Sequence, residues 1–155
     1  MNRKTAVCIV TYGDEFIILK RVERPGDTWS GQYCLPGGFL KDGETIEEGA
    51  LRELQEETGI HRNEVTFSGS IEPLSPMSRR DVIVYPLHFK LADKVAIHTG
   101  EEHVWSAYVK FSELSLHTEP VKGNMFLVNG VEIWGLTYRI LRNFMNGSGF
   151  HDLGS

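Results

Sequence analysis

Residues 38–60 have the sequence GFLKDGETIEEGALRELQEETGI, which predicts a loop, one helix and a helix stop. Thr45 and Glu48 have the spacing of a capping box, so the helix is expected to begin near Ile46. Gly59 suits a left-handed C-cap at the other end. Apolar residues recur at helical spacing between these ends, which predicts that one side of the helix is buried.

Three carboxylates gather on this helix. Glu53, Glu56 and Glu57 are three and four residues apart, which places them on one side. Their charges repel one another, so a hard divalent cation such as Mg²⁺ or Mn²⁺ is the expected partner, because it prefers oxygen ligands. Gly49 is expected to leave room for a metal or a phosphate between them. The alternative is a solvated, Glu-rich helix.

The spacing of the fixed positions adds to this pattern. They are Gly38, five residues, Glu44, seven residues, then Arg52, Glu53, Leu54, any residue, Glu56, Glu57, any residue, Gly59 and Ile60. This arrangement resembles the signature of the Nudix hydrolase family. The resemblance implies an α/β/α sandwich with a mixed β-sheet. It also implies a metal-dependent hydrolase that cleaves the phosphoanhydride bond of a nucleoside diphosphate linked to another group.

The signature covers residues 38–60 and is called the Nudix box below. Other residues in it and beside it have expected structural or binding roles. Glu44 and Arg52 are expected to form a structural pair that holds the loop to the helix, and Gly59 to end that helix. Gly37 and Gly38 can adopt tight geometry, with backbone groups facing the metal and the substrate. Gly37 is therefore a candidate metal ligand beside the three glutamates.

The catalytic base is expected to be a carboxylate, and in this family its position varies. The candidates are Glu53 itself and a residue outside the box. Glu102 lies six residues before Tyr108, a spacing that many Nudix sequences share. Glu102 is therefore a candidate base and metal ligand. The alternative is an acidic turn between two strands.

Substrate contacts are expected from three further side chains. Arg21 and Arg79 can hold phosphates, and Trp29 lies in a loop beside the box where it can stack on a base. The alternatives are solvated arginines and a hydrophobic cover over the edge of the sheet.

A partial resemblance to the coenzyme A diphosphatase group concerns the substrate. Its matching features are Arg21, the sequence GQYCLPGG at 31–38 and the sequence IWGLT at 133–137. Leu35 stands where that group has phenylalanine, and Val22 where it has serine. ADP-ribose or other ADP-sugars, nucleoside triphosphates and dinucleoside polyphosphates remain alternatives, because the box is common to all of them. A noncatalytic nucleotide sensor is the alternative class.

Composition bounds the remaining expectations. A chain of 155 residues suits one domain, expected at 1–146, with a flexible tail at 147–155. The net charge of -5 argues against nonspecific nucleic-acid binding, and no apolar run is long enough for a membrane span. Cys8 and Cys34 are expected to be buried free thiols, which predicts a cytoplasmic location. Many relatives are dimers, so a homodimer is among the expected states.

Hydrophobic periodicity predicts an α/β fold. Strands are expected at residues 5–10, 16–22, 33–35, 65–71, 81–91 and 104–109. Residues 117–128 are expected to be irregular, and residues 131–145 to form an amphipathic helix. Strands interleaved with two helices predict a sheet covered by helices on both faces.

Overall fold

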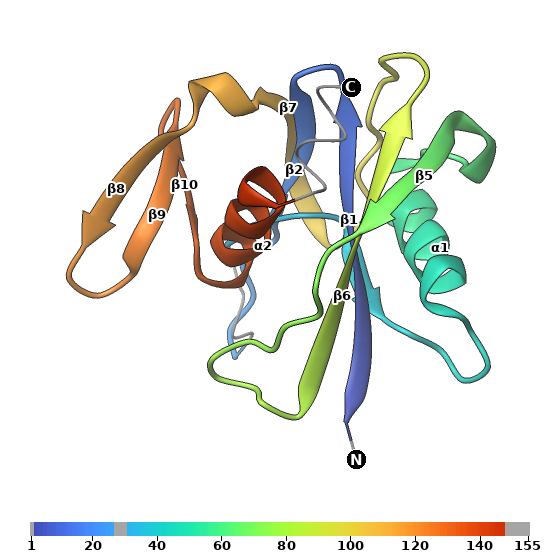
Figure 1. Ribbon diagram of the computed structural model, residues 1–155, viewed down its shortest axis with the longest axis horizontal. Coiled ribbons are helices and arrows are strands. Elements are labelled where there is room, and N and C mark those ends of the chain that lie inside the picture. The colour runs from blue at the N-terminus through green and yellow to red at the C-terminus, as the bar shows by residue number, and fades with distance from the viewer. Residues whose placement is uncertain (1, 27–30, 148–155) are drawn as a thin grey trace.

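The computed structural model describes residues 2–26 and 31–147, and within them it contains two α-helices, two short 3-10 helices and two β-sheets (Figure 1). The strands are β1 (Arg3–Tyr12), β2 (Glu15–Arg21), β3 (Tyr33–Cys34), β4 (Gly37–Phe39), β5 (Val65–Ser70), β6 (Val82–Leu91), β7 (His103–Lys110), β8 (Ser115–Glu119), β9 (Gly123–Val128) and β10 (Val131–Trp134). The helices are α1 (Ile46–Thr58) and α2 (Gly135–Asn146).

The larger sheet is mixed. Its central path is β3-β2-β1-β6-β5, with β4 paired to β1 and β7 paired to β2. β1 runs parallel to β6, from Arg3 opposite Val82 to Thr11 opposite Lys90, and the other pairings are antiparallel. The smaller sheet is antiparallel, in the order β10-β9-β8.

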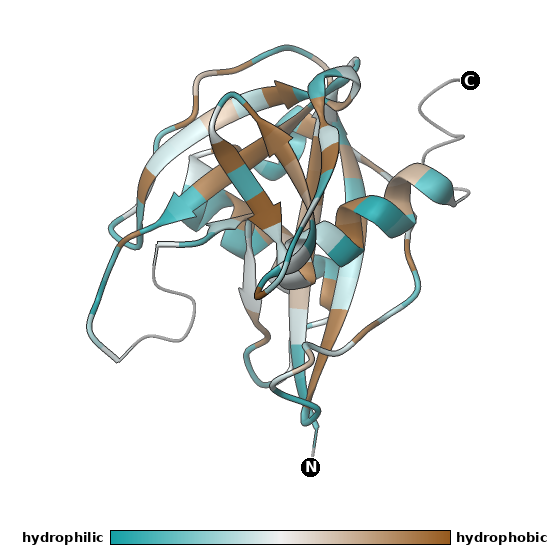
Figure 2. Ribbon diagram, turned by 90° about the vertical axis from the view of Figure 1, so that its left-hand side faces the viewer, coloured by the Kyte–Doolittle hydropathy of each residue, from teal (hydrophilic) through white to brown (hydrophobic). Residues whose placement is uncertain are grey.

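The two helices cover opposite faces of the larger sheet, as β1 illustrates. Ala6 and Cys8 face the core beneath α1, whereas Val7 and Ile9 face the core beneath α2 and the smaller sheet. This alternation follows from the two-residue period of a strand. Figure 1 shows α1 and α2 on either side of the sheet, and Figure 2 shows hydrophobic residues concentrated on the strands between them. The predicted α/β/α sandwich with a mixed sheet is confirmed.

The C-terminal third differs from the sequence prediction. Residues 117–128 are largely ordered as strands β8 and β9, and the predicted helix at 131–145 begins only at Gly135, after β10. Asn129 and Gly130 have φ of 47° and 80°, which suits the tight turn between β9 and β10. The β-branched Val131 and Ile133 continue that hairpin opposite Val128 and Phe126, so pairing across the turn overrides helical periodicity.

The helix α1 has the predicted ends. Thr45 accepts a hydrogen bond from the Glu48 N–H at 3.1 Å, and the Glu48 carboxylate accepts one from the Thr45 N–H at 2.8 Å. Gly59 has φ of 78°, the left-handed conformation expected of a C-cap. The capping box and the C-cap are therefore both confirmed.

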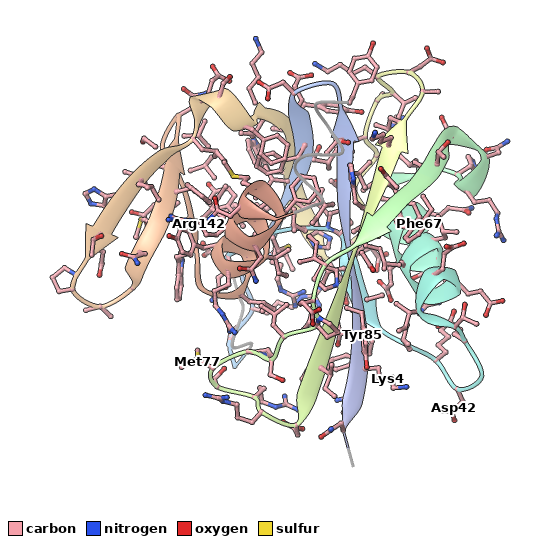
Figure 3. All side chains as sticks on the ribbon, in the orientation of Figure 1. Lys4, Asp42, Phe67, Met77, Tyr85 and Arg142 are labelled. Carbon is pink, nitrogen blue, oxygen red and sulfur yellow. The ribbon has the colours of Figure 1, made fainter. Side chains whose placement is uncertain are left out.

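Two loops leave the sheet at the end of the molecule where β1 begins. Figure 3 places Asp42 in the loop before α1 and Met77 in the loop before β6, on opposite sides of the sheet.

Cys8 is buried and Cys34 is half-buried, and both are free thiols. In the part of the chain that the structure describes, no helix has the length and apolar character needed to cross a membrane.

Candidate active site

The glycines of β4 open the edge of the sheet to the carboxylates of α1. A β-carbon on Gly38 would lie 2.6 Å from the Glu53 carboxylate, and one on Gly37 would overlap the carbonyl oxygen of Ala6. The Gly37 N–H donates a hydrogen bond to Glu57 at 2.8 Å. Only residues without side chains fit here, so the pair of glycines lets Glu53 and Glu57 reach the space beyond the strand.

That space is a cavity of about 390 Å³. Glu53, Glu57 and Glu102 line it, so the structure brings carboxylates of α1 and of the residue before β7 to one cavity. Apolar side chains also line it, among them Val84 of β6 and Leu136 at the start of α2. The cavity therefore offers carboxylates to a cationic or metal-bound group and apolar side chains to an uncharged one.

Glu57 is the electrostatic centre of this cluster. Burial raises the pKa of Glu57 well above its usual range, and the charges of Glu53 and Glu102 add to that increase. The hydrogen bond from the Gly37 N–H acts in the opposite direction but is outweighed. A cation placed beside Glu57 would relieve both the repulsion and the cost of burial.

Arg52 organises the rest of the box. Its Nε donates to Glu44 at 2.6 Å, its Nη2 donates to Glu44 at 3.0 Å and to the Phe39 carbonyl at 3.2 Å, and its Nη1 donates to Glu53 at 2.9 Å. The forked guanidinium thus ties the loop and β4 to the helix. The structure forms the expected Glu44–Arg52 pair.

The Glu44–Arg52 pair predicts an acid-sensitive contribution to stability. The hydrogen bond from Arg52, followed by that from the Lys41 N–H, lowers the pKa of Glu44 from 4.5 to about 2. A lowered folded pKa means that the contribution is complete above the unfolded value and is lost as pH falls toward about 2. We therefore expect Glu44→Gln to lower the melting temperature at pH 7, and the difference from wild type to shrink on acidification.

Thermal melts from pH 7 down to about 2 check this prediction, with Glu47→Gln on the exposed first turn of α1 as the matched control. A difference for Glu44→Gln that stays constant over this range would contradict it.

Glu56 lies apart from the other two helix carboxylates. Its side chain is 54% exposed, does not line the cavity, and accepts a hydrogen bond from Arg52 Nη1 at 3.3 Å. The same nitrogen lies 2.9 Å from Glu53, so a cationic group already bridges Glu53 and Glu56. Within the described residues, no three His, Cys, Asp or Glu side chains are arranged as a metal site.

The residues nevertheless fit a hard divalent cation. The cavity brings Glu53, Glu57 and Glu102 together, and the Arg52 contact shows that Glu53 and Glu56 can converge on one positive centre. Carboxylate oxygens are the donors that Mg²⁺ and Mn²⁺ prefer. Glu57 in particular is a buried carboxylate among like charges, which a cation would neutralise.

The remaining predicted site residues differ in whether they line the cavity. Arg21 lines the cavity, whereas Arg79 does not and pairs with Asp81 at 3.0 Å. Glu102 lines the cavity, whereas its neighbour Glu101 does not. Trp29 lies outside the described residues.

The expectation for Gly49 is wrong. A β-carbon at this position would overlap a methyl group of Leu40 and would lie 3.3 Å from Glu44, so the glycine makes room for packing against the loop. It does not line the cavity. Position on the helical wheel did not reveal this, because the neighbour comes from another segment of the chain.

Gly49→Ala is therefore expected to leave catalysis nearly unchanged. The Leu40 methyl is the flexible end of a side chain and can shift, while alanine gains about 1 kcal/mol of helix propensity over glycine. Thermal melts together with steady-state kinetics check this. A loss of turnover above about tenfold, about 1.4 kcal/mol, with an unchanged melting temperature would restore a direct role at the site.

Several cavity residues were missed by sequence reasoning. They are Thr5, Phe39, Cys34, His103, Leu136 and Thr137. Alternation along β1 would have placed Thr5 on the face opposite α1, and the IWGLT segment contains the two α2 residues. The inward position of Cys34 and His103 depends on strand pairing, which no local pattern contains.

The fold and the site together define an α/β/α domain with an acidic cavity beside a glycine-rich strand. The family model for the NUDIX domain matches residues 1–126, and the chain belongs to the NUDIX domain family. The resemblance to the Nudix hydrolase family is thereby confirmed.

Three similar proteins illustrate the range of the family. The ADP-ribose pyrophosphatase of Methanocaldococcus jannaschii is 40% identical over 52 residues, covering 34% of this chain and 29% of the archaeal protein. The nucleoside triphosphatase NudI of Escherichia coli is 36% identical over 123 residues, covering 74% of this chain and 86% of NudI. A NUDIX hydrolase structure from Nitrosomonas europaea has a TM-score of 0.68 at 20% identity, covering 94% of this chain and 71% of that one. The chain thus spans less than a third of the archaeal enzyme's length.

Proposed function

We propose that this protein is a pyrophosphohydrolase that cleaves the phosphoanhydride bond of a nucleoside diphosphate linked to another group, with Mg²⁺ or Mn²⁺ as its cofactor. The observation that carries the proposal is the meeting of Glu53, Glu57 and Glu102 around one cavity beside the glycines of β4. Relatives named ADP-ribose pyrophosphatase and ADP-sugar pyrophosphatase support the substrate class.

The glutamates of α1 and Glu102 would hold the cation. Glu53, Glu56 and Glu57 supply carboxylates, and Gly37 supplies a backbone group close to Glu57. When bound, the cation offsets phosphate charge and lowers the pKa of a bound water. Gly38 has no side chain, so a phosphate can approach Glu53 past this position without a steric clash.

The proposed base is Glu53. Arg52 Nη1 holds its carboxylate at 2.9 Å, which orients it without covering the cavity side. A carboxylate in this place can accept the proton of the attacking water. Glu102 is the second candidate, and its backbone carbonyl is fixed by the Val22 N–H at 2.8 Å.

Arg21 is the proposed phosphate-binding cation. It lines the cavity beside Glu102, at a point where the pairing of β2 with β7 changes register. Such an irregularity re-aims a side chain relative to a regular strand. Val84 and Leu136, which also line the cavity, would contact the uncharged part of the substrate.

Two other substrate classes are supported by particular observations. The longer match to NudI favours a nucleoside triphosphate pyrophosphatase. Leu136 and Thr137 of the IWGLT segment line the cavity, which favours a coenzyme A type of substrate. A noncatalytic nucleotide sensor is the alternative if no compound is turned over.

The proposal also covers the partner, the cellular location and the oligomeric state of the protein. Its partner is a small-molecule nucleotide, without nucleic acid or membrane, and the cytoplasm is the proposed location because free thiols such as Cys8 and Cys34 are typical of reducing compartments. A homodimer is the proposed assembly, and light scattering on the purified protein tests it.

A substrate screen with Mg²⁺ and with Mn²⁺ tests the function. The panel holds ADP-ribose, NADH, coenzyme A, a dinucleoside polyphosphate and several nucleoside triphosphates, with products identified by mass. AMP from ADP-ribose or NADH is the expected result. Release of 3′,5′-ADP from coenzyme A, or of pyrophosphate from a triphosphate, would select the other classes. Binding without turnover would overturn the enzyme proposal in favour of the sensor.

A further inference from the structure

A thiol and an imidazole lie against each other in the wall of the same cavity. Cys34 Sγ is 3.7 Å from His103 Nε2, and both side chains line the cavity. They come from β3 and β7, which both pair with β2, where Cys34 lies opposite Leu19 and His103 opposite Arg21. Neither side chain has a part in the hydrolysis proposed above.

The geometry of the pair suits a thiophilic metal ion. Zinc binds thiolate sulfur at about 2.3 Å and imidazole nitrogen at about 2.0 Å, so two such ligands at a tetrahedral angle lie about 3.5 Å apart. The Sγ–Nε2 distance of 3.7 Å is within a few tenths of an ångström of that value. Without a metal, the same contact is a weak S–H···N hydrogen bond.

The ring and its surroundings support a ligand on Nε2. His103 is 5% exposed, and its Nδ1 has no hydrogen-bond partner among the described residues. Nε2 is the ring nitrogen that lies 3.7 Å from Cys34 Sγ, and a metal bound there would leave the ring proton on Nδ1. Glu57 and Glu102 line the same cavity and give it a negative field that attracts divalent cations.

We propose that Cys34 and His103 form a Zn²⁺-binding pair that inhibits the enzyme by occupying the cavity. Zn²⁺ forms bonds to Cys34 Sγ and His103 Nε2, the thiol proton passes to solvent, and water completes the coordination. The donors separate this ion from Mg²⁺, because sulfur and imidazole select zinc whereas carboxylates select magnesium. The inhibition rests on the proposed function, whereas the binding of the metal does not.

Co²⁺ absorption tests the binding directly. Co²⁺ is titrated into the full chain in excess Mg²⁺, which fills the carboxylates, and a thiolate-to-cobalt charge-transfer band is followed in the near ultraviolet. We expect the band in wild type, its loss in Cys34→Ser and its retention in Cys8→Ala, since Cys8 is sealed beneath α1 and outside the cavity. Added Zn²⁺ should abolish the band by displacement.

His103→Gln is expected to weaken cobalt binding by about tenfold or more, since even the loss of an outer-shell partner costs that much. No band in wild type, or a band that survives in Cys34→Ser, would overturn the proposal. Thermal melts show that each variant is folded.

Zinc inhibition of hydrolysis tests the consequence. Each variant's rate is expressed relative to its own zinc-free rate, and we expect about tenfold more Zn²⁺ to be needed for half-inhibition of Cys34→Ser than of wild type or Cys8→Ala. Equal zinc sensitivity in all three would overturn the inhibitory role. If no substrate is turned over, the proposed function fails and the cobalt band still decides the metal site.

Discussion

Replacing Glu57 with glutamine is expected to lower turnover by about a thousandfold or more, because it removes a carboxylate that would hold the cation in the cavity. Glutamine keeps the length of the side chain and can still accept the hydrogen bond from the Gly37 N–H. The fold should therefore remain intact. The measurement is steady-state kinetics on the best compound of the substrate screen, with Mg²⁺ in excess.

The same variant has an expected effect on stability. A carboxyl group whose folded pKa is raised costs stability as pH rises from its unfolded value toward the folded one. Without metal, Glu57→Gln should therefore melt at or above the wild-type temperature, and its advantage should grow between pH 5 and pH 8. This pH range lies between the ordinary pKa of 4.5 and the raised pKa of about 9. Added Mg²⁺ should raise the melting temperature of wild type more than that of the variant.

Glu47 serves as the control, and Glu56 provides a second test of the metal assignment. Glu47→Gln, on the exposed first turn of α1, should leave turnover unchanged, and Glu56→Gln should reduce it as Glu57→Gln does if both carboxylates hold the cation. Near-normal turnover in both Glu56→Gln and Glu57→Gln would refute the metal assignment.

Replacing Gly38 with alanine is expected to reduce turnover about a hundredfold with little change in melting temperature. The new β-carbon would lie 2.6 Å from the Glu53 carboxylate, which is the free end of a side chain and can move away. The protein thus avoids the steric cost by displacing Glu53, and a shift of about 1 Å at a reacting group costs about 10²-fold in rate. Kinetics and thermal melts on the same preparation check both parts.

Gly37→Ala is the informative comparison, because its β-carbon would meet backbone atoms. It would overlap the Ala6 carbonyl oxygen and lie 2.9 Å from the Val7 Cα, neither of which can move independently of β1. We expect a loss of about 1–3 kcal/mol of stability, which lowers the melting temperature by several degrees. Equal effects of the two substitutions on both turnover and melting would contradict the distinct roles of Gly37 and Gly38.

Local chemistry explains which parts of the structure were predictable. The capping box and Gly59 set the ends of α1 through hydrogen bonds within four residues, and the spacing of Glu44 and Arg52 anticipated their contact. Asn129-Gly130 is likewise a local turn signal, and it accounts for the strand that replaces the start of the helix expected at 131–145. Such features depend on residues that are close in the chain, so they can be predicted from the sequence.

The sequence alone determined the family, the helix that carries the glutamates and the likeness of Glu102 to a site residue. Only the tertiary structure decided that Glu102 faces the cavity while Arg79 pairs with Asp81, and that Cys34 meets His103 across 69 residues of chain. The reason is physical. A helix records its pattern in successive residues, whereas a cavity is made where distant strands are brought together by the burial of their apolar faces.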